Sequence, residues 1–531
     1  MLQSKSQKKI VVAGPGTGKT FLFKEILKGK KNAITLTFVN SLVEDLSLDL
    51  CGLSEVKTLH GFSRSIIAAA TGNVKVFPKL SKVIGEDAEI LKGQKIYFDS
   101  LFHNRDDQNE HLPFYKKRRV FYGQYGFADI IYAAVLYLEL KAEKTPTFDQ
   151  VLIDEFQDFN RLEVSLIDLL ASKSPILIAG DDDQSLYHFK DASPSHIRQL
   201  YSNENKDFTS FNLPHCSRCT RVIVDAVNDI ILAAELEGFL QGRINKPYIF
   251  FEDEKKEADC SRYPKLAHVT CFAKQAPYFI AKAIRGIAEE RREKFSVLII
   301  APTRTRCRNI AQALEVKGFE NVQYVDAEKN DDPTLMDALM LLAEDPKCNL
   351  GWRIAAKLIL SEVEFKELLE KTNEQSPKSI CDLLDDKTIK KIKSLLNTFK
   401  KIAKGATPNP DRAAELLQEL ELDPQLLARE KLRKRIETAG SRGSDPTTRN
   451  ISIKITTIPS SKGLAEDYVF IADFDDRYFL EKNQQCSDQK IFDFLVALTR
   501  ARRKIFLMSS GQKEPKFLTW IAKERIEKVA L

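Results

Sequence analysis

Short runs of apolar residues, each followed by a turn or by acidic residues, recur along the chain. The runs at 10–13, 151–153 and 176–179 are apolar at every position, which is typical of parallel strands buried on both faces. The segment 294–319 has the pattern of a strand, a turn and a helix in succession. Together these patterns predict an α/β protein with parallel sheets flanked by helices.

The first apolar run leads directly into a glycine-rich turn, AGPGTGKT, and then into an apolar-periodic helix. Gly14, Gly16 and Gly18 let the backbone curl so that its N–H groups face inward, and the helix start adds the positive end of its dipole. Lys19 would reach the β- and γ-phosphates of a nucleotide, and Thr20 would offer a hydroxyl to Mg²⁺. The alternative is a flexible loop that happens to contain glycine.

The second apolar run ends in acids, IDEFQDFN. Because adjacent side chains on a strand point to opposite sides, Asp154 can face a magnesium ion while Glu155 faces an attacking water. An apolar run followed by acids is otherwise typical of a solvated strand end. The upstream glycine loop favours the magnesium site, and the strand at 176–179 would deliver Gln184 to the same edge of a doubly wound sheet.

These segments resemble motifs of the UvrD/Rep group of superfamily 1 helicases. AGPGTGKT, IDEFQD and GDDDQSLYHF resemble motifs I, II and III, and alanine is common in that group where Ala13 replaces the glycine of the strict phosphate loop. LTFVN and TLHGF resemble motifs Ia and Ib. LPHCSRCTRVIVDAVN, TTIPSSKGL and FLVALTRARRKI resemble motifs IV, V and VI. The motifs follow one another in the family's order over nearly the whole chain.

The resemblance implies two RecA-like phosphate-loop domains, each a parallel sheet flanked by helices and interrupted by a mainly helical insertion. The expected boundaries are 1–61 and 146–208 for domain 1A, 62–145 for insertion 1B, 209–330 and 450–531 for domain 2A, and 331–449 for insertion 2B. The many charges of insertion 2B are more typical of solvated helix faces than of a DNA surface.

The resemblance also implies an ATP hydrolase, with ATP and Mg²⁺ between the two domains and movement 3′→5′ along single-stranded DNA or a tailed duplex. The expected ATP-binding residues are Gly14, Pro15, Gly16, Thr17, Gly18, Lys19 and Thr20, and the expected metal ligands are Thr20 and Asp154. The expected catalytic residues are Glu155, Gln184, Arg218 and Arg500. Outside this resemblance, Arg500 in TRARRK would be interpreted as a salt-bridged surface residue.

A translocase has to hold single strands without reading their sequence, and base stacking on aromatic side chains meets that need. The resemblance assigns the DNA track to Phe38, Asn40, Thr58, His60, Tyr187, Phe189, Lys190, Thr457 and Lys462. Phe38 is equally typical of a core aromatic, and an isolated His60 would be a surface histidine. Stacking tolerates both sugars, so RNA is an alternative track.

Several positions depart from the family pattern. Ser217 stands where the family usually has an adenine-stacking tyrosine, and Pro459 and Ala465 replace a histidine and a glutamate of motif V, with Glu466 one place later. These positions concern base, ribose or coupling contacts rather than phosphate chemistry. We therefore expect hydrolysis with a relaxed preference for adenine, whose reading glutamine has only Gln3 and Gln7 as candidates.

Composition changes this picture little. At 531 residues the chain is long enough for about three or four folded units, and its net charge of +6 permits a nucleic-acid partner without requiring one. No apolar stretch of membrane-spanning length occurs, so we expect a cytoplasmic protein without membrane contact. Of nine cysteines, only Cys216 and Cys219 are close in sequence; they lack a second pair at zinc-site spacing, and reduced thiols are expected.

A second hypothesis comes from another functional class. The chain would be a nucleotide-dependent DNA-binding switch or regulatory subunit that does not separate strands, similar to the UvrD-like partner of a nuclease in Gabija-type anti-phage systems. The short second insertion and the altered motif V favour it, and a nuclease or DNA-repair protein would be its partner. Unwinding of a 3′-tailed duplex discriminates between the two hypotheses.

Overall fold

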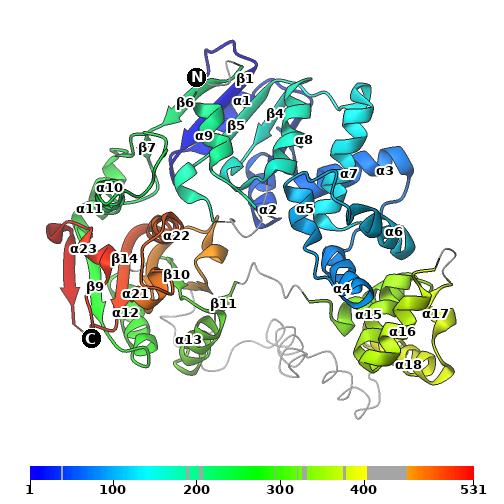
Figure 1. Cartoon of the computed structure of the whole chain (residues 1–531). Coiled ribbons are helices and arrows are strands. Elements are labelled where there is room, and N and C mark those ends of the chain that lie inside the picture. The colour runs from blue at the N-terminus through cyan, green and yellow to red at the C-terminus, as the bar shows by residue number, and fades with distance from the viewer. Residues whose placement is uncertain are drawn as a thin grey trace. The chain divides into compact units, whose positions relative to one another are not determined.

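The first parallel sheet contains six strands in the order β3-β2-β4-β5-β1-β6 and is coloured blue to green in Figure 1. Its pairings are all parallel, and every residue of β2, β4 and β5 is buried, as helices on both faces require. The strands are β1 (Lys8–Ala13), β2 (Ala33–Thr37), β3 (Glu55–Thr58), β4 (Gln150–Ile153), β5 (Ile176–Gly180) and β6 (Thr209–Leu213).

Helices α1 (Lys19–Leu27), α2 (Asn40–Asp49), α8 (Arg161–Ala171) and α9 (Ser195–Tyr201) accompany this sheet. A capping box begins α8: the Asn160 side chain accepts a hydrogen bond from Glu163 N at 3.1 Å, and Asn160 N donates to Glu163 Oε2 at 3.0 Å. The two bonds satisfy backbone donors that the helix start would otherwise leave unpaired. They fix the start of α8, where the short acidic segment that follows β4 ends.

The second parallel sheet contains seven strands in the order β11-β12-β10-β13-β14-β9-β15, and its pairings are also all parallel. Its strands are β9 (Leu266–Thr270), β10 (Ser296–Ile300), β11 (Val322–Tyr324), β12 (Ser452–Thr456), β13 (Glu466–Ile471), β14 (Ala501–Ser509) and β15 (Ile526–Val529). Its helices include α10 (Arg221–Leu236), α11 (Glu254–Arg262), α12 (Ala276–Glu290), α13 (Arg304–Val316), α21 (Asp476–Phe479), α22 (Asp488–Leu498) and α23 (Lys516–Thr519).

The α/β architecture expected from the sequence is confirmed: two parallel sheets flanked by helices, as in two RecA-like domains. A small pair of parallel strands, β7 (His215–Cys216) and β8 (Ile249–Phe250), follows the first sheet in the chain. The exact boundaries of the domains and insertions stay a prediction.

This computed structural model describes residues 1–37, 40–186, 191–202, 207–291, 293–319, 321–325, 332–374, 378–403 and 451–530. Both sheets belong to unit 1, which comprises Met1–Leu59, Lys141–Lys329 and Gly443–Leu531. Unit 2 comprises His60–Leu140 and Asn330–Arg442, so parts of both predicted insertions pack into one body. None of the helices that the structure describes is long and apolar enough to cross a membrane.

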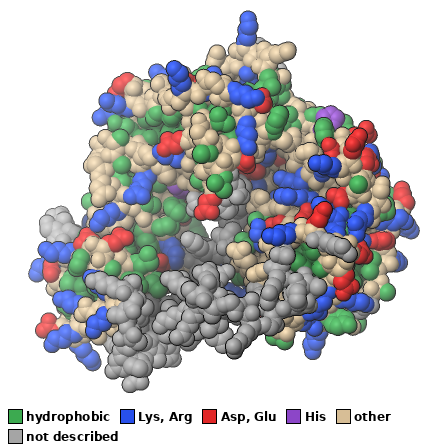
Figure 2. Space-filling model, turned by 180° about the vertical axis from the view of Figure 1, so that it is seen from behind, with side chains coloured by type: hydrophobic (Ala, Val, Ile, Leu, Met, Phe, Trp, Pro, Cys, Tyr) green, Lys and Arg blue, Asp and Glu red, His purple; other side chains and the backbone are tan. Residues whose placement is uncertain are grey.

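Unit 2 is helical in its described parts. Its helices are α3 (Leu59–Thr71, from its second residue on), α4 (Leu80–Lys92), α5 (Phe98–His103), α6 (Leu112–Tyr122), α7 (Phe127–Leu140), α14 (Leu335–Glu344), α15 (Asn349–Ile359), α16 (Glu362–Lys371), α17 (Ile380–Leu383) and α18 (Asp386–Ala403). On the face shown in Figure 2, basic and acidic side chains are interspersed, as the similar totals of 81 basic and 75 acidic residues allow.

A buried carboxylate joins the two sequence segments of unit 2. Asp87 Oδ2 accepts from Arg118 Nη2 at 2.6 Å, and Asp87 Oδ1 accepts from Arg353 Nη2 at 2.8 Å. All three side chains are almost completely inaccessible to solvent. Burial alone would raise the pKa of Asp87, but the two guanidinium groups outweigh it and hold the pKa below its ordinary value.

Replacing this carboxylate should destabilise unit 2. In Asp87→Asn the two buried arginines lose their shared negative charge, and breaking a buried pair typically costs about 3–5 kcal/mol. The unfolding free energy can be followed through Trp352 in a Trp520→Phe background, because these are the two tryptophans of the chain and only Trp352 belongs to unit 2. The control is Glu89→Gln on the exposed side of the same helix; an equal effect of both variants would contradict the prediction.

Candidate nucleotide site

The predicted phosphate loop, Gly14 to Gly18, joins β1 to α1. Gly16 and Gly18 have φ angles of 71° and 91°, a region that glycine enters at little cost. Thr17 donates from Oγ1 to Gly14 O at 2.9 Å. Gly18 caps α1 without a side-chain hydrogen bond, so the first N–H groups of the helix remain available to an anion.

The acids of the DEFQD segment face the lysine of this loop. Lys19 Nζ lies 3.0 Å from Glu155 Oε1 and 3.8 Å from Asp154 Oδ1, and all three side chains are largely buried. Burial alone would lower the pKa of Lys19, but the two carboxylates outweigh it and raise the pKa above its ordinary value. Lys19 is therefore a fully charged ammonium group at neutral pH.

Strand alternation does not separate the two acids as we expected from the sequence. β4 ends at Ile153, and Glu155 adopts a left-handed conformation with φ 55° and ψ 40° before the short turn η2 (Phe156–Asp158). This turn of the backbone brings both carboxylates to the same lysine. A glutamate rarely adopts such angles, and strained backbone of this kind is concentrated at functional sites.

The two acids have different electrostatic environments. Burial raises the pKa of Asp154 to about 6, against the opposing effect of Lys19. Burial would also raise the pKa of Glu155, but Lys19 and Lys462 outweigh it and hold that pKa well below the ordinary range. Glu155 is thus an ionised carboxylate at neutral pH.

Magnesium fits this arrangement. Asp154 Oδ1 is buried and has no hydrogen-bond partner among the described residues, which leaves one carboxylate oxygen for a hard cation. The half-buried Thr20 follows Lys19 at the start of α1 and adds a hydroxyl oxygen. Asp154 and Thr20 therefore have the oxygen chemistry that Mg²⁺ prefers.

Lys462, from the turn after β12, lies beside the same acids. It pairs with the Asp158 carboxylate, its Nζ lies 3.6 Å from Glu155 Oε2, and it donates to Gln184 O at 2.9 Å. The side chain is 3% exposed. Lys462 therefore lies among the carboxylates that follow the strands of the first sheet, and its expected role on the DNA track stays a prediction.

Gln184 ends the short turn η3 (Asp182–Gln184) after β5, and its Oε1 accepts from Arg500 Nη2 at 3.1 Å. Arg500 also donates to the carbonyls of Val496 and Leu464 at 2.9 and 3.1 Å. It is buried and has no carboxylate partner among the described residues. Burial, reinforced by the nearby Arg218, lowers the pKa of Arg500 to about 10. Arg500 is thus a buried cation without an ion pair among the described residues, and the nearby Glu155 offsets its burial only in part.

Arg218 packs directly on the phosphate loop. Ser217 donates from its backbone N and from Oγ to Gly16 O, at 2.9 and 3.1 Å. A β-carbon added to Gly16 would lie 2.3 Å from Arg218 Cβ, so only glycine permits this approach. Tyr248 Oη donates to Pro15 O at 3.0 Å. The loop is therefore contacted by residues that follow the first sheet in the chain.

The sequence did not single out several of these contacts. Asp158 is the third acid of IDEFQD, so its proximity in sequence to Glu155 was a usable signal. Tyr248 carries no such signal, because its partner Pro15 lies more than two hundred positions away. Glu466, which follows the altered motif V position, pairs with Lys454 at 2.8 Å rather than with the nucleotide-site residues above.

The structure describes only some of the residues expected to contact DNA. Phe38, Tyr187, Phe189 and Lys190 lie outside the described residues, and Asn40 is the first residue of α2. Thr58 ends β3, and Thr457 Oγ1 donates to Ser460 Oγ at 3.3 Å. In unit 2, the His60 ring lies 4.5 Å from that of Phe127. Their role on DNA stays a prediction.

Two family models match the chain. The UvrD/REP helicase N-terminal domain matches residues 86–205, and the UvrD-like helicase C-terminal domain matches residues 352–512. Both models describe UvrD-type helicases, and the N-terminal model matches ahead of the C-terminal one. The chain belongs to the UvrD/Rep helicase family. The resemblance noted in the sequence motifs is confirmed.

Similar proteins of this family differ in how much of the chain they cover. "ATP-dependent DNA helicase Rep" of Buchnera aphidicola is 25% identical over 56% of this chain and 47% of its own length. "Probable DNA helicase II homolog" of Mycoplasma pneumoniae is 22% identical over 97% of this chain and 84% of its own length. "DNA helicase II" of Escherichia coli is 36% identical over 16% of this chain. The chain thus spans about half of the Rep protein that it matches.

Lys462→Met tests whether this lysine stabilises the candidate nucleotide site of this UvrD/Rep-family protein. Because Asp158 and Glu155 would lose a buried cation, we expect unit 1 to be destabilised by about 3–5 kcal/mol. Unfolding can be followed through Trp520, which belongs to unit 1, in a Trp352→Phe background, with the exposed Lys482→Met as control. Unchanged stability combined with weakened DNA binding would instead assign Lys462 to the DNA track.

Proposed function

We propose that this protein is an ATP-dependent DNA helicase or translocase that hydrolyses ATP between its two parallel-sheet domains and moves 3′→5′ on single-stranded DNA. The observation that carries the proposal is the buried Arg500 beside Gln184, which forms no ion pair among the described residues and is influenced by Glu155, the partner of Lys19. A cation buried without a counterion is costly, and a transferred γ-phosphate would supply the missing negative charge. The family assignment supports ATP and DNA as the ligands.

In this proposal the loop glycines, Lys19 and the two metal ligands have separate roles. The N–H groups of Gly14, Gly16 and Gly18 and the start of α1 bind the phosphate oxygens. Lys19 exchanges its carboxylate partners for the β- and γ-phosphates. Asp154 and Thr20 hold Mg²⁺, which neutralises phosphate charge when bound.

Glu155 acts as the base. Once Lys19 engages phosphate, Glu155 keeps Lys462 as a charged neighbour and orients a water for attack on the γ-phosphorus. Lys19 and Lys462 hold the pKa of Glu155 low and keep it ionised. When Lys19 moves to the phosphates, that pKa rises and the carboxylate becomes a stronger acceptor for the proton of the water. Arg500 and Arg218 stabilise the charge that spreads over the equatorial oxygens, an effect that reaches about 10³-fold or more for an arginine finger.

The proposed movement of the domains depends on which segments of the chain supply these residues. Lys19 and Glu155 come from the first sheet, whereas Arg218 and Arg500 come from segments that follow it. Hydrolysis removes the anion that both sides share, so the domains separate and close once per ATP. The aromatic residues Phe38, Tyr187 and Phe189 are proposed to stack on the bases of the strand.

Lys19→Ala and Glu155→Gln test the ATP site. Glu155→Gln keeps the size of the side chain but removes the base, so DNA-stimulated ATP turnover should fall by about 10²–10⁴-fold while nucleotide binding persists. Lys19→Ala should lose both turnover and nucleotide affinity. Steady-state hydrolysis with single-stranded DNA and titration with a fluorescent nucleotide measure the two effects.

Exposed Glu143→Gln and Lys28→Ala serve as matched controls and should behave like the wild type. Near wild-type turnover in either active-site variant would refute the assignment of the site.

Duplexes with a 3′ or a 5′ single-stranded tail test direction and strand separation. A 3′→5′ motor loaded on the tail should unwind the 3′-tailed duplex with ATP and leave the 5′-tailed one intact. Strand displacement is followed by the separation of a fluorophore from its quencher, and parallel assays with RNA tails identify the track. ATP hydrolysis without displacement of either duplex would favour the nucleotide-dependent switch, which the altered motif V residues Pro459 and Ala465 make the second candidate.

A further inference from the structure

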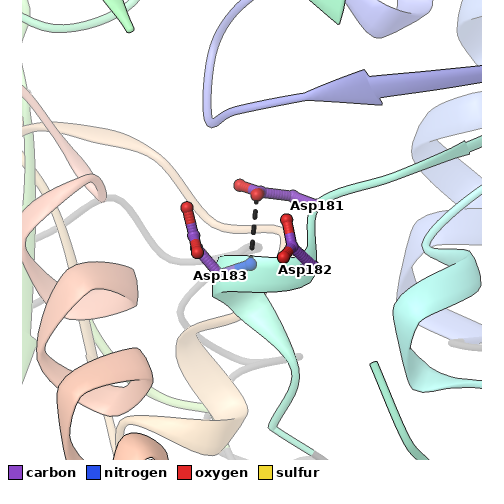
Figure 3. A group of neighbouring side chains, drawn as sticks. All are labelled: Asp181, Asp182 and Asp183. Carbon is purple, nitrogen blue, oxygen red and sulfur yellow. Dashed lines mark hydrogen bonds between the residues drawn. The ribbon is translucent and has the colours of Figure 1, made fainter. Parts of the chain in front are cut away.

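Three adjacent aspartates lie at the end of β5 beside the proposed site. Asp181, Asp182 and Asp183 are buried, and their carboxylate oxygens lie within 4.8 Å of one another. Figure 3 shows the three carboxylates gathered on one side of η3. Buried acids this close repel each other strongly unless cations accompany them.

The segment between α10 and β8 supplies two of those cations. Lys246 Nζ lies 3.0, 2.5 and 2.8 Å from the carboxylates of Asp181, Asp182 and Asp183. Arg243 Nε donates to Asp183 at 2.8 Å, and Arg198 of α9 donates to Asp182 at 3.0 Å. Three side-chain cations therefore face three carboxylates, and a lysine already occupies the place that a metal ion would take.

One member of the cluster controls Gln184. Gln184 Nε2 donates to Asp181 Oδ2 at 2.5 Å, and its Oε1 accepts from Arg500 Nη2 at 3.1 Å. A carboxylate can only accept and a guanidinium can only donate. A reversed amide would set two donors against each other at Arg500 and two acceptors at Asp181, so these two partners together favour one orientation of Gln184.

The same segment also touches the phosphate loop. Tyr248, two residues beyond Lys246, donates to Pro15 O at 3.0 Å, so one short stretch contacts both the loop and the cluster behind Gln184. Lys246 is 5% exposed, and burial alone would lower its pKa, but the three aspartates outweigh burial and raise it. The lysine therefore remains charged and stays paired with all three carboxylates.

We propose that Lys246 is a positioning residue for ATP turnover: its ion pair holds the Asp181 carboxylate in place, Asp181 orients the Gln184 amide, and Gln184 orients Arg500. This inference rests on the proposed ATP hydrolysis and adds to it a residue outside the catalytic set named above. Without Lys246 the three carboxylates would lose the cation between them and move apart, and Gln184 would lose its fixed orientation. Turnover, rather than nucleotide affinity, would be impaired.

The test is a double-mutant cycle of Lys246→Met with Gln184→Ala in the full chain. Lys246→Met should lower kcat for DNA-stimulated ATP hydrolysis by about tenfold to a hundredfold, the effect of one lost charge-assisted hydrogen bond, with nucleotide affinity little changed. In the Gln184→Ala background the same substitution should cause no further loss. Thermal stability is measured for all four proteins.

Arg243→Gln is the matched control, because it removes a cation of the same cluster that bonds Asp183 and not Asp181. It should lower stability but leave kcat near the wild-type value. If Lys246→Met does not fold, Asp181→Asn replaces it, since that variant leaves Lys246 paired with Asp182 and Asp183. It should show the same loss of kcat and the same lack of additivity.

Equal losses of kcat with and without Gln184 would overturn the inference and assign Lys246 a purely structural role. A rise in KM at unchanged kcat, or a Gln184→Ala variant as active as the wild type, would overturn it as well. A wild-type chain that does not hydrolyse ATP would refute the proposed function itself and the inference with it, so the two failures are distinguishable.

Discussion

The burial of ionised side chains at the carboxyl ends of the first sheet is the constraint on which the rest of unit 1 depends. Asp154, Glu155 and Asp158 follow β4, and Asp181 to Asp183 follow β5; Glu155 is partly exposed and the other five are buried. Such groups remain charged only if cations accompany them. Those cations include Lys462 and Lys246, so ion pairs link the ends of β4 and β5 to segments distant in the sequence.

This arrangement differs from the buried charges of unit 2 in one respect. Asp87 is completely surrounded by the side chains that neutralise it, and nothing in that cluster is left without a partner. In unit 1, by contrast, the described residues offer Arg500 no ion pair and Asp154 Oδ1 no hydrogen bond. A protein tolerates incomplete pairing of buried charges where a ligand completes it, and in the proposed mechanism ATP and Mg²⁺ do so. Binding and loss of the γ-phosphate would then alter the charge balance that links the domains.

Features determined by neighbouring residues were predictable. The buried strands β1, β4 and β5 follow from continuous apolar runs, and the phosphate loop follows from three glycines between a strand and a helix. Lys19, Asp154 and Glu155 lie together, because parallel strands of one sheet end at the same edge. Strand alternation failed at Glu155, where the left-handed backbone turns the side chain toward the same lysine as Asp154.

Contacts between distant segments could not be derived in this way. Nothing near Lys462, Lys246 or Tyr248 indicates Asp158, Asp181 or Pro15 as partners, since more than sixty residues separate each pair. The sequence by itself determined the strands, the loop and the types of charged group, because backbone geometry and hydrophobic periodicity act over a few residues. Only the tertiary structure decided which cation neutralises which carboxylate, because that depends on the distances between folded elements. For the same reason, only the tertiary structure decided that Arg500 forms no ion pair among the described residues.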